Sequence, residues 1–426
     1  MTRIALVDGV RTPFVKSWSD YNHLTALDLA RRAVQELIER SDLRPRDLDE
    51  VVMGSVLPPS RTPNVAREVI MSLGLPLSIP GYTLGRACAS SLQAVTSAAE
   101  SMLCGRNHVV IAGGTESLSN VPVPYSKNFV SALMAFQKAK TVQQRMAALG
   151  RVNPKKDLLP QAPELTEIST GLTMGQHAED MARKWNISRE DQDRLAVMSH
   201  QRAHQAISDG RLTAEIAPVL APPDQRPVTV DGYVRADTTV EALSKLKPSF
   251  DRKYGTLTAG NSSGLTDGAA AVLLMTEEKA KELGFRPLAY LKGWAYAALD
   301  PQQGLLMGPS YATPKVLDQV GLKLSDIDLI DMHEAFAAQV LCNLRAWEST
   351  SFAREKLGRD AAIGAVDMDR FNVCGGSIAL GHPFGATGAR MLLTTARELD
   401  RREGRHALIT ICAAGAMGVS MVIERA

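Results

Sequence analysis

The sequence predicts a layered α/β protein built from more than one packed unit. Short apolar runs at residues 4–7, 51–56 and 109–112 alternate with helical stretches at 26–38 and 91–103. This alternation is typical of helices packed against the faces of sheets. The 426 residues are also too many for one small hydrophobic core, so two or three packed units are expected.

The order of these elements returns later in the chain. Residues 43–52 are echoed by residues 322–330, and both segments follow a helix and enter a strand. Residues 108–111 match residues 406–409, at an offset of 298 positions (406 minus 108). A chance likeness between two amphipathic βα units would explain one such echo. Two echoes in the same order favour a duplication, so we expect two halves of similar topology.

A segment between the two halves has no equivalent in the second half. It is punctuated by prolines, which mark loops and turns, at Pro122, Pro124, Pro222 and Pro223. We therefore predict an N-terminal half at 1–119, completed by about 251–285, an inserted loop domain at 120–250, and a C-terminal half at 286–426.

Composition and charge exclude several classes of protein. The 48 basic and 46 acidic residues give a formal net charge of +2, so nothing attracts the chain as a whole to nucleic acid. The five cysteines are odd in number and show no CxxC spacing, so we expect neither a disulfide framework nor a metal site. With no apolar run of membrane-spanning length and no recognisable targeting segment, we expect a cytoplasmic protein.

One stretch departs from this neutral balance. Residues 117–156 contain no Asp or Glu but seven Lys or Arg residues, interleaved with apolar side chains at spacings near three and four. This pattern predicts a basic amphipathic helical hairpin, a surface that suits anionic lipid. The alternative is a lid that packs its apolar face on the protein and leaves the lysines in solvent or near the phosphates of a ligand.

A first candidate for chemistry is Cys88, in residues 85–94, where a strand ends and a small-residue helix begins. The free N–H groups at a helix start favour thiolate, so this position is expected to lower the pKa of the thiol. A single cysteine is more often a small core residue than a nucleophile. The offset of 298 carries Cys88 to Ala386, at a second glycine-rich helix start.

Three further segments of the second half carry polar or nucleophilic side chains in unusual surroundings. His382 lies between glycines and a proline in residues 375–388, a costly loop unless close approach to a ligand is required. His333 ends a strand in residues 331–337, and Cys412 lies in residues 410–418, which follow the final long apolar strand.

Together these four segments resemble the thiolase family over essentially the whole chain. The resemblance implies two duplicated βαβαβ halves, forming an α-β-α-β-α core, plus a loop domain. It implies that Cys88 is the acylated nucleophile, His382 the base that activates it, and Cys412 the acid and base at the acetyl-CoA carbon. The backbone N–H groups of Cys88 and Ala414 would form an oxyanion hole.

His333 departs from the commonest family pattern, Asn-Glu-Ala-Phe, by replacing the Asn. This substitution is similar to the branch that includes the β subunits of multienzyme fatty-acid oxidation complexes. His333 would then donate to the thioester oxygen beside His382, a contribution that typically changes the rate by about 10²–10³. A second departure is the turn at 412–416, where the family usually has a longer glycine run.

Contacts to CoA and the acyl chain follow more loosely from the resemblance. Residues 258–270 are similar to the loop along which pantetheine lies, with Ala259 and Ser263 at the contact positions. Met174 matches a residue that covers the acyl pocket, and Arg235 one beside the adenine; Phe336 is assigned to the same substrate site. CoA would be a substrate, with no cofactor and no metal.

The implied activity is that of a 3-ketoacyl-CoA thiolase of fatty-acid β-oxidation. Such an enzyme cleaves 3-oxoacyl-CoA with CoA to acetyl-CoA and a shortened acyl-CoA through an acyl-cysteine. A biosynthetic acetoacetyl-CoA thiolase is the alternative. Cys412 argues against a decarboxylating ketoacyl synthase, and the presence of Cys88 and His382 argues against a non-catalytic thiolase-like lipid carrier. Expected partners are a second copy of the chain, a hydratase/dehydrogenase α subunit, and the inner face of a membrane through 120–156.

Overall fold

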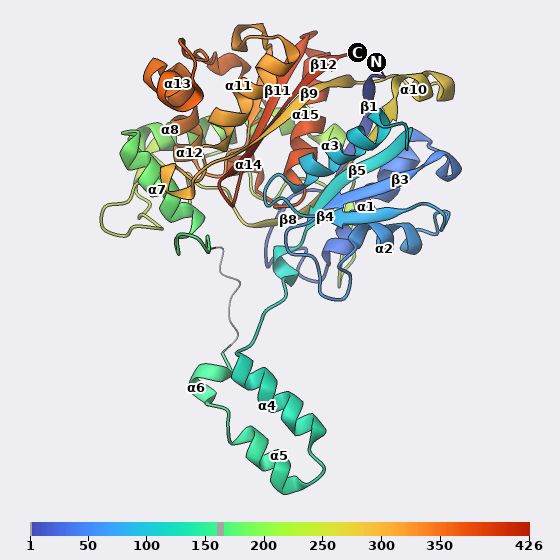
Figure 1. Ribbon diagram of the computed structural model, residues 1–426, viewed down its shortest axis with the longest axis vertical. Coiled ribbons are helices and arrows are strands. Elements are labelled where there is room, and N and C mark those ends of the chain that lie inside the picture. The colour runs from blue at the N-terminus through green and yellow to red at the C-terminus, as the bar shows by residue number, and fades with distance from the viewer. Residues whose placement is uncertain (1, 160–165) are drawn as a thin grey trace. The chain divides into compact units, whose positions relative to one another are not determined.

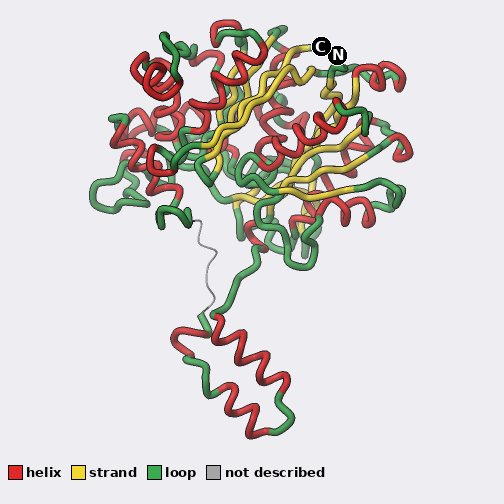
Figure 2. Tube along the Cα trace, viewed as in Figure 1, coloured by secondary structure: helices red, strands yellow, loops and turns green. Residues whose placement is uncertain are grey.

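The computed structural model describes residues 2–159 and 166–426 and divides into two compact units (Figure 1). Unit 1 comprises Met1–Asn120 and Glu167–Ala426, and unit 2 comprises Val121–Thr166. Unit 1 holds every named strand, with helices on both sides of them (Figure 2). The predicted layered α/β class is confirmed.

The first half of the sheet has five strands. Their order is β4 (Gly81–Leu84), β3 (Glu50–Gly54), β5 (Val109–Glu116), β8 (Thr266–Thr276) and β1 (Ile4–Arg11). β3 is parallel to β4 and β5, whereas β8 is antiparallel to β5 and β1. A short strand, β2 (Val15–Lys16), also pairs with β8.

The second half repeats this order. It runs β10 (Leu329–Met332), β11 (His406–Ala413), β12 (Met417–Arg425) and β9 (Ala289–Ala298), with β10 parallel to β11 and the other pairs antiparallel. Where the first half has β4, the second has a single parallel bridge from Phe371 to Ile330. Antiparallel pairing of β1 with β9 joins the halves. This shared strand order supports the predicted duplication.

Helices form three layers around the two half-sheets. α1 (Ala26–Ser41) and α2 (Val65–Ser72) cover one outer face, α3 (Ser90–Leu103) and α15 (Thr387–Arg401) lie between the half-sheets, and α11 (Gly308–Val320) and α12 (Ala337–Glu348) cover the other outer face. Strand alternation explains this arrangement, because successive side chains point to opposite faces. In β5, Val109 and Ile111 pack toward α1 and α2, whereas Val110 and Ala112 pack toward α3 and α15.

The two central helices meet at positions related by the sequence repeat. The Ala389 N–H donates to Ser91 Oγ at 2.9 Å, and these residues are 298 positions apart. A Cβ on Gly388 would lie 2.8 Å from the backbone nitrogen of Leu92, so only glycine permits this approach. The predicted offset of 298 therefore relates the two helices that touch at the centre of unit 1.

The segment predicted as one insert contributes to both units. In unit 1 it supplies α7 (Met174–Lys184), α8 (Arg189–Ser208), the hairpin of β6 (Val219–Ala221) and β7 (Arg226–Val228), and α9 (Val240–Ser244). The remaining α-helices of unit 1 are α10 (Glu277–Leu283), α13 (Thr350–Leu357) and α14 (Ser377–Leu380). The domain boundaries drawn from the sequence remain a prediction.

Unit 2 contains α4 (Lys127–Lys138), α5 (Val142–Leu149) and α6 (Pro154–Asp157). The Asp157 carboxylate accepts from Ser126 Oγ at 2.9 Å and from the Asn153 N–H at 2.8 Å. These bonds join the end of α6 to the N-terminal caps of α4 and α6. Its helices leave many large apolar side chains exposed: Val130, Leu133, Met134, Val142, Met146 and Leu149. In the described ranges, no helix combines the length and apolar character needed to cross a membrane.

Candidate active site

Cys88 lies in a tight turn between β4 and α3, one residue before the helix cap at Ala89. Ala87 has a φ of +45°, a left-handed conformation that is rare for a residue with a side chain. Ser90 stabilises the turn, since its Oγ accepts from the Arg86 N–H at 2.8 Å and donates to the Ala87 carbonyl at 2.6 Å. The turn leaves Cys88 partly exposed at the start of a buried helix.

The electrostatic surroundings of Cys88 oppose ionisation in the free protein. Burial, with a smaller contribution from the nearby Glu116 carboxylate, raises the pKa of the thiol to about 11, although the backbone N–H groups of Ala414 and of Cys88 itself act to lower it. Burial outweighs the amide groups. The expectation that the helix start lowers the thiol pKa is therefore wrong for the net effect, although both amides predicted for an oxyanion hole act on this sulfur.

His382 lies in the turn between α14 and α15. Its backbone N–H donates to the Gly264 carbonyl at 3.1 Å, and its Nδ1 lies 2.6 Å from Thr387 Oγ1. Burial, with a smaller effect of the Arg390 charge, lowers the pKa of His382 to about 3, so the imidazole is neutral.

Glycines at Gly114 and Gly385 let this turn approach β5. A Cβ on Gly114 would lie 1.9 Å from the Gly385 carbonyl oxygen. Glu116, at the end of β5, accepts from the Gly385 N–H at 3.0 Å and from the N–H groups of Val56 and Leu57 at 2.9 and 3.0 Å. Burial raises the pKa of Glu116 to about 7. The carboxylate thus joins the His382 turn to the first half of the sheet.

His333 follows β10 and is fully buried. Its N–H donates to the Thr410 carbonyl at 2.9 Å, and its Nδ1 lies 2.9 Å from Ser377 Oγ. The centroids of the His333 and His382 rings are 4.2 Å apart. Burial, the neighbouring His382 and the Arg390 charge all lower the pKa of His333 well below its usual value.

The next residue, Glu334, is a buried carboxylate that sequence reasoning did not single out. It accepts from Ser199 Oγ at 2.6 Å, from Asn372 Nδ2 at 2.7 Å and from the Ile378 N–H at 3.2 Å. These bonds join α8 and the 372–378 loop to the strand end that carries His333. Its position within the Asp331–Ala337 motif was the available signal, since a charged residue in a buried motif needs several partners.

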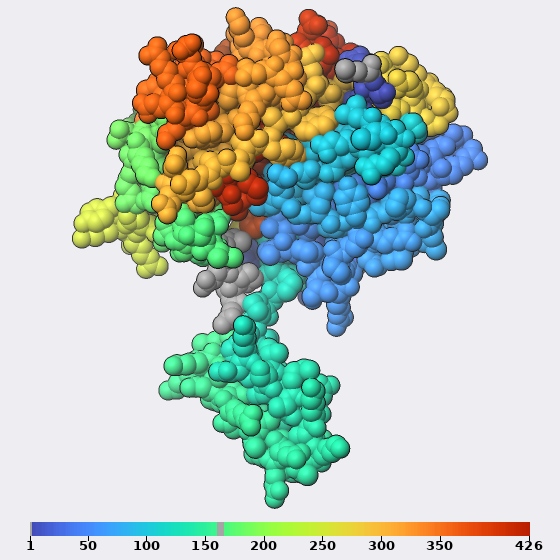
Figure 3. All heavy atoms as spheres, in the orientation of Figure 1, coloured from blue at the N-terminus to red at the C-terminus, as the bar shows by residue number. Residues whose placement is uncertain are grey.

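Cys412 is buried near the end of β11. It belongs to one apolar cluster with Met174 and Phe336, two of the residues predicted to contact substrate. Burial and the neighbouring Cys88 raise the pKa of Cys412. Beyond it, the exposed Gly415 N–H donates to Glu167 Oε2 at 2.9 Å. Dark red atoms from the last part of the chain reach the surface near the centre of the view in Figure 3.

The loop predicted to follow pantetheine lies against both histidine segments. The Ser263 N–H donates to the Ala335 carbonyl at 2.9 Å, and the Gly264 carbonyl accepts from His382. Ala259 is exposed and Ser263 partly buried, so both have access to solvent. Arg235 is exposed, and within the described ranges no hydrogen bond or ion pair joins its side chain to the other site residues.

The Cys88 sulfur and one imidazole nitrogen from each of His333 and His382 lie within 4.8 Å of one another. Each Nδ1 is paired with a hydroxyl, whereas both Nε2 atoms have no partner among the described residues. A thiol beside two imidazoles can act as an activated nucleophile, and the same atoms are also ligands that Zn²⁺ prefers.

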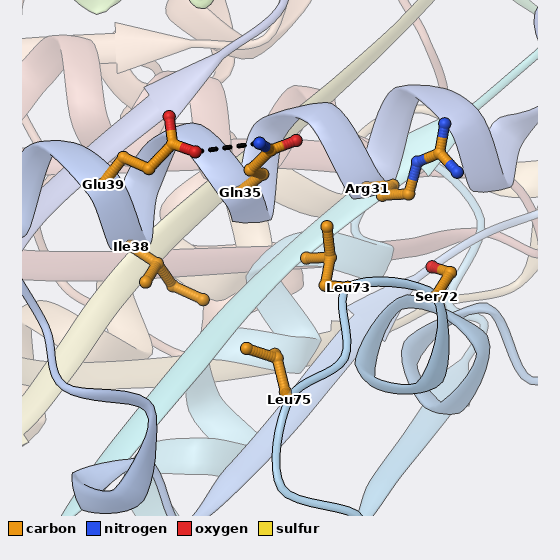
Figure 4. A pocket seen from close by; sticks show the side chains of 7 residues that line it. All are labelled: Arg31, Gln35, Ile38, Glu39, Ser72, Leu73 and Leu75. Atoms are coloured by element: carbon orange, nitrogen blue, oxygen red, sulfur yellow. Dashed lines mark hydrogen bonds between the residues drawn. The ribbon is translucent and has the colours of Figure 1, made fainter.

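A surface groove of about 450 Å³ lies elsewhere, between α1 and α2 (Figure 4). It contains none of the four predicted catalytic side chains. The residues that line it are Arg31, Gln35, Ile38, Glu39, Ser72, Leu73 and Leu75. We assign this groove no role in the chemistry.

The fold and the site define an α/β protein that brings two cysteines and two histidines together from duplicated halves. Comparison with known families places it further. The model for the thiolase N-terminal domain matches residues 4–278, and that for the thiolase C-terminal domain matches residues 285–425. The chain belongs to the thiolase family, as its motifs predicted.

Individual relatives match over the full chain. A 3-ketoacyl-CoA thiolase of Yersinia enterocolitica is 51% identical over 422 residues, covering 99% of this chain and 97% of the relative. A crystal structure of human mitochondrial 3-ketoacyl-CoA thiolase in complex with CoA superposes with a TM-score of 0.84 at 31% identity, covering 100% and 98% of the two chains. The acetyl-CoA acetyltransferase of Bacillus anthracis gives a TM-score of 0.84 at 33% identity, covering 100% and 99%.

Proposed function

We propose that this chain is an acyltransferase with the activity of a 3-ketoacyl-CoA thiolase in fatty-acid β-oxidation. The observation that carries the proposal is the grouping of Cys88, His333 and His382 within 4.8 Å, in a chain 51% identical to a 3-ketoacyl-CoA thiolase. Turnover of 3-oxoacyl-CoA and CoA to acetyl-CoA and a shortened acyl-CoA tests it. CoA takes part as a substrate, and we propose no resident cofactor.

In the first half-reaction, His382 Nε2 takes the Cys88 proton as the sulfur attacks the C3 ketone carbon of the substrate. The C2–C3 bond then breaks, and its electron pair passes to the acetyl-CoA enolate. Cys412 gives its proton to C2 of the enolate. Acetyl-CoA leaves, with the shortened acyl group on Cys88, a proton on His382 and a thiolate at Cys412.

In the second half-reaction, the Cys412 thiolate takes the proton of the incoming CoA thiol. The CoA sulfur attacks the acyl-Cys88 carbonyl, and the Cys88 thiolate departs. It recovers its proton from His382, so every group returns to its starting state. The low pKa of His382 and the high pKa of Cys88 support a proton transfer that accompanies the attack of the sulfur, rather than a thiolate–imidazolium pair in the resting enzyme.

Negative charge develops on oxygen in both half-reactions. The N–H groups of Cys88 and Ala414, which already act on the Cys88 sulfur, are suited to the oxygen of the tetrahedral intermediate at the acyl carbon. The buried imidazoles of His333 and His382 are suited to the enolate oxygen. Ala259, Ser263, Met174 and Phe336 would contact CoA and the acyl chain, and Arg235 would lie beside the adenine.

We propose a preference for medium or long acyl chains. The support is His333, which replaces the more common Asn of the family pattern, and the apolar cluster around Cys412. The test is kcat/KM across 3-ketoacyl-CoA substrates of increasing length, with rising values expected. A maximum at the four-carbon substrate would favour the biosynthetic alternative, to which the likeness with the Bacillus anthracis acetyl-CoA acetyltransferase also points.

We also propose that unit 2 contacts an anionic membrane surface from the cytoplasmic side. Lys127, Lys138, Lys140 and Arg145 are exposed on or beside α4 and α5, next to exposed Val130, Met134 and Met146. Basic residues near such a surface contribute about 1 kcal/mol each, and apolar side chains insert between headgroups. We further propose that a hydratase/dehydrogenase α subunit binds this surface and that the chain forms a homodimer.

Co-sedimentation with phosphatidylglycerol-containing vesicles tests the membrane contact. Changing Lys127, Lys138, Lys140 and Arg145 to Gln should weaken binding by up to about three orders of magnitude, with thiolysis retained. A matched control changes four exposed basic residues of unit 1, Arg46, Lys281, Arg286 and Lys323, to Gln. Equal, salt-insensitive sedimentation of both variants and the parent would eliminate the membrane role and favour the lid. Sedimentation velocity, with and without an α subunit, tests the assembly.

A further inference from the structure

We propose that Ser377 and Arg390 are positioning residues that hold His333 in the tautomer with its hydrogen on Nε2, opposite to the tautomer of His382. The inference rests on the proposed function for its consequence, but the hydrogen-bond pattern that carries it is independent of the reaction. It explains how two neighbouring imidazoles supply one acceptor and one donor to the same site.

Arg390 is a fully buried arginine on α15. Its Nη2 donates to Ser377 Oγ at 3.3 Å, and its Nη1 lies 3.6 Å from Asp331 Oδ2. Asp331 Oδ2 also accepts from Thr395 Oγ1 at 3.2 Å. A guanidinium group can donate but never accept, so the Ser377 oxygen must be the acceptor of this bond.

The Ser377 hydroxyl then has a single hydrogen to donate. Within the described ranges, the acceptor in reach is His333 Nδ1, at 2.9 Å. If His333 Nδ1 carried a hydrogen instead, the buried Ser377 hydroxyl hydrogen would have no acceptor. The cost of a buried unpaired group corresponds to about a tenfold to hundredfold bias in tautomer populations. His333 therefore carries its hydrogen on Nε2.

His382 has the opposite arrangement. Thr387 Oγ1 donates its one hydrogen to the Pro383 carbonyl at 3.0 Å. With that hydrogen directed at the Pro383 carbonyl, Thr387 Oγ1 accepts at its 2.6 Å contact with His382 Nδ1, and the imidazole hydrogen lies on Nδ1. His382 Nε2 is left with a lone pair to take a proton, while His333 Nε2 carries a hydrogen to donate to an oxyanion.

The tautomers matter only because both imidazoles are neutral. Among the described residues, the charged and titratable groups near them are Arg390 with its partner Asp331, Glu334, Glu116, Cys88 and Cys412. Arg390 is the cation among these groups, and it disfavours protonation of both His333 and His382. Arg390 thus orients the Ser377 hydroxyl and also keeps His333 neutral, and only a neutral imidazole has two tautomers.

Nitrogen-15 NMR of histidine-labelled protein tests the assignment directly. The chain has eight histidines, and His333→Asn and His382→Asn variants identify the two signals of interest. We expect the proton-bearing nitrogen to be Nε2 in His333 and Nδ1 in His382. In Ser377→Ala, the His333 signals should shift toward a mixture of tautomers. A His333 hydrogen on Nδ1 in the parent protein would overturn the proposal, whatever the enzyme's substrate.

Kinetics test the positioning role. We expect Ser377→Ala to lower kcat for thiolysis by about tenfold to a thousandfold with KM within twofold of the parent, and Ser377→Thr to restore most of the loss by keeping the hydroxyl. Ser101→Ala, which removes another buried serine hydroxyl far along α3, should leave kcat unchanged. The variant that removes Arg390 is the double variant Arg390→Met with Asp331→Asn, because Arg390→Met alone would leave the charge of Asp331 without its cation. Parental kcat and parental tautomers in Ser377→Ala would overturn the role of Ser377, whereas absence of thiolysis in the parent protein would refute the proposed function alone.

Discussion

The ring centroids of His333 and His382 lie 4.2 Å apart, with the ring planes tilted by 48°. Each ring is fixed through Nδ1 by a hydroxyl, and each leaves its Nε2 unpaired among the described residues. Two imidazolium ions at this distance would repel each other strongly in a buried site. A proton released by Cys88 therefore resides on one ring, while the other stays neutral.

The first prediction concerns the acyl-enzyme. Mixing the protein with 3-ketoacyl-CoA in the absence of free CoA should place an acyl group on Cys88, because this cysteine combines partial exposure with a neighbouring base. Mass spectrometry of the peptide that contains Cys88 measures the adduct. The exposed Cys104 provides an internal control for non-specific acylation. An adduct on Cys412 alone, or full activity in Cys88→Ala, would refute the assignment.

A second prediction separates the roles of His382 and Cys412. His382→Asn and Cys412→Ala should each lower thiolysis by about 10²–10⁴, since each removes one proton-transfer group. Cys412→Ala should still form some acyl-Cys88 slowly, whereas His382→Asn should fail to form it. Circular dichroism checks that both variants fold. Parental turnover in either variant would mean that the proposed proton transfers are assigned to the wrong residues.

The third prediction follows from the pKa values of the free protein. Because the pKa of the Cys88 thiol is about 11 and the pKa of His382 is about 3, the pair is a neutral thiol and a neutral imidazole at pH 7. The thiolate fraction rises as pH approaches the thiol pKa, so alkylation of Cys88 by iodoacetamide should accelerate up to about pH 10 without a plateau. Measuring this rate in a Cys104→Ser background removes the exposed competitor. A plateau by pH 8 would instead indicate a thiolate–imidazolium pair.

A fourth prediction concerns Zn²⁺. The sulfur and nitrogen atoms of Cys88, His333 and His382 are close enough to share a metal ion, and binding would displace a proton from Cys88. Zn²⁺ should therefore inhibit thiolysis reversibly, more strongly at higher pH, and EDTA should restore activity. Prior acylation of Cys88 should protect the site against Zn²⁺ binding, because the acylated sulfur is no longer a metal ligand. Equal Zn²⁺ affinity of Cys88→Ser and the parent protein in a binding assay would place the metal elsewhere.

The sequence motifs predicted the family, and the structure brings three of the four side chains that they singled out within 4.8 Å of one another. Each of the four lies in a segment whose glycines, prolines or strand end demand a special backbone. Cys88 and His382 were found in this way. The raised pKa of the Cys88 thiol was not predicted. A helix start is visible in the sequence, whereas the burial that raises this pKa depends on how the two halves pack.

Arg390 shows what the motifs missed and how it could have been found. On a helix of ordinary amphipathic pattern, an arginine reads as a solvent-facing residue. The offset of 298, however, carries the fully buried Leu92 onto Arg390. Applying the repeat to every core position of α3 would have indicated a charge inside the protein, although not its partners Ser377 and Asp331, which come from separate segments.

Unit 2 marks a different limit. The basic and apolar spacing predicted a helical hairpin, and α4 and α5 form one within 117–156. What it touches depends on surroundings that the chain does not encode, so its partner stays a proposal.

The division of the catalytic groups between the halves has a consequence during synthesis. Cys88 belongs to the first half of the sheet, whereas His382 comes from the second, 294 positions later (382 minus 88). At about 5–20 residues per second, a ribosome needs roughly 15–60 s to cover that stretch. Throughout this interval the nascent polypeptide carries the nucleophilic thiol without its base, so the growing chain is chemically quiet toward cellular thioesters until the second half has emerged and folded against the first.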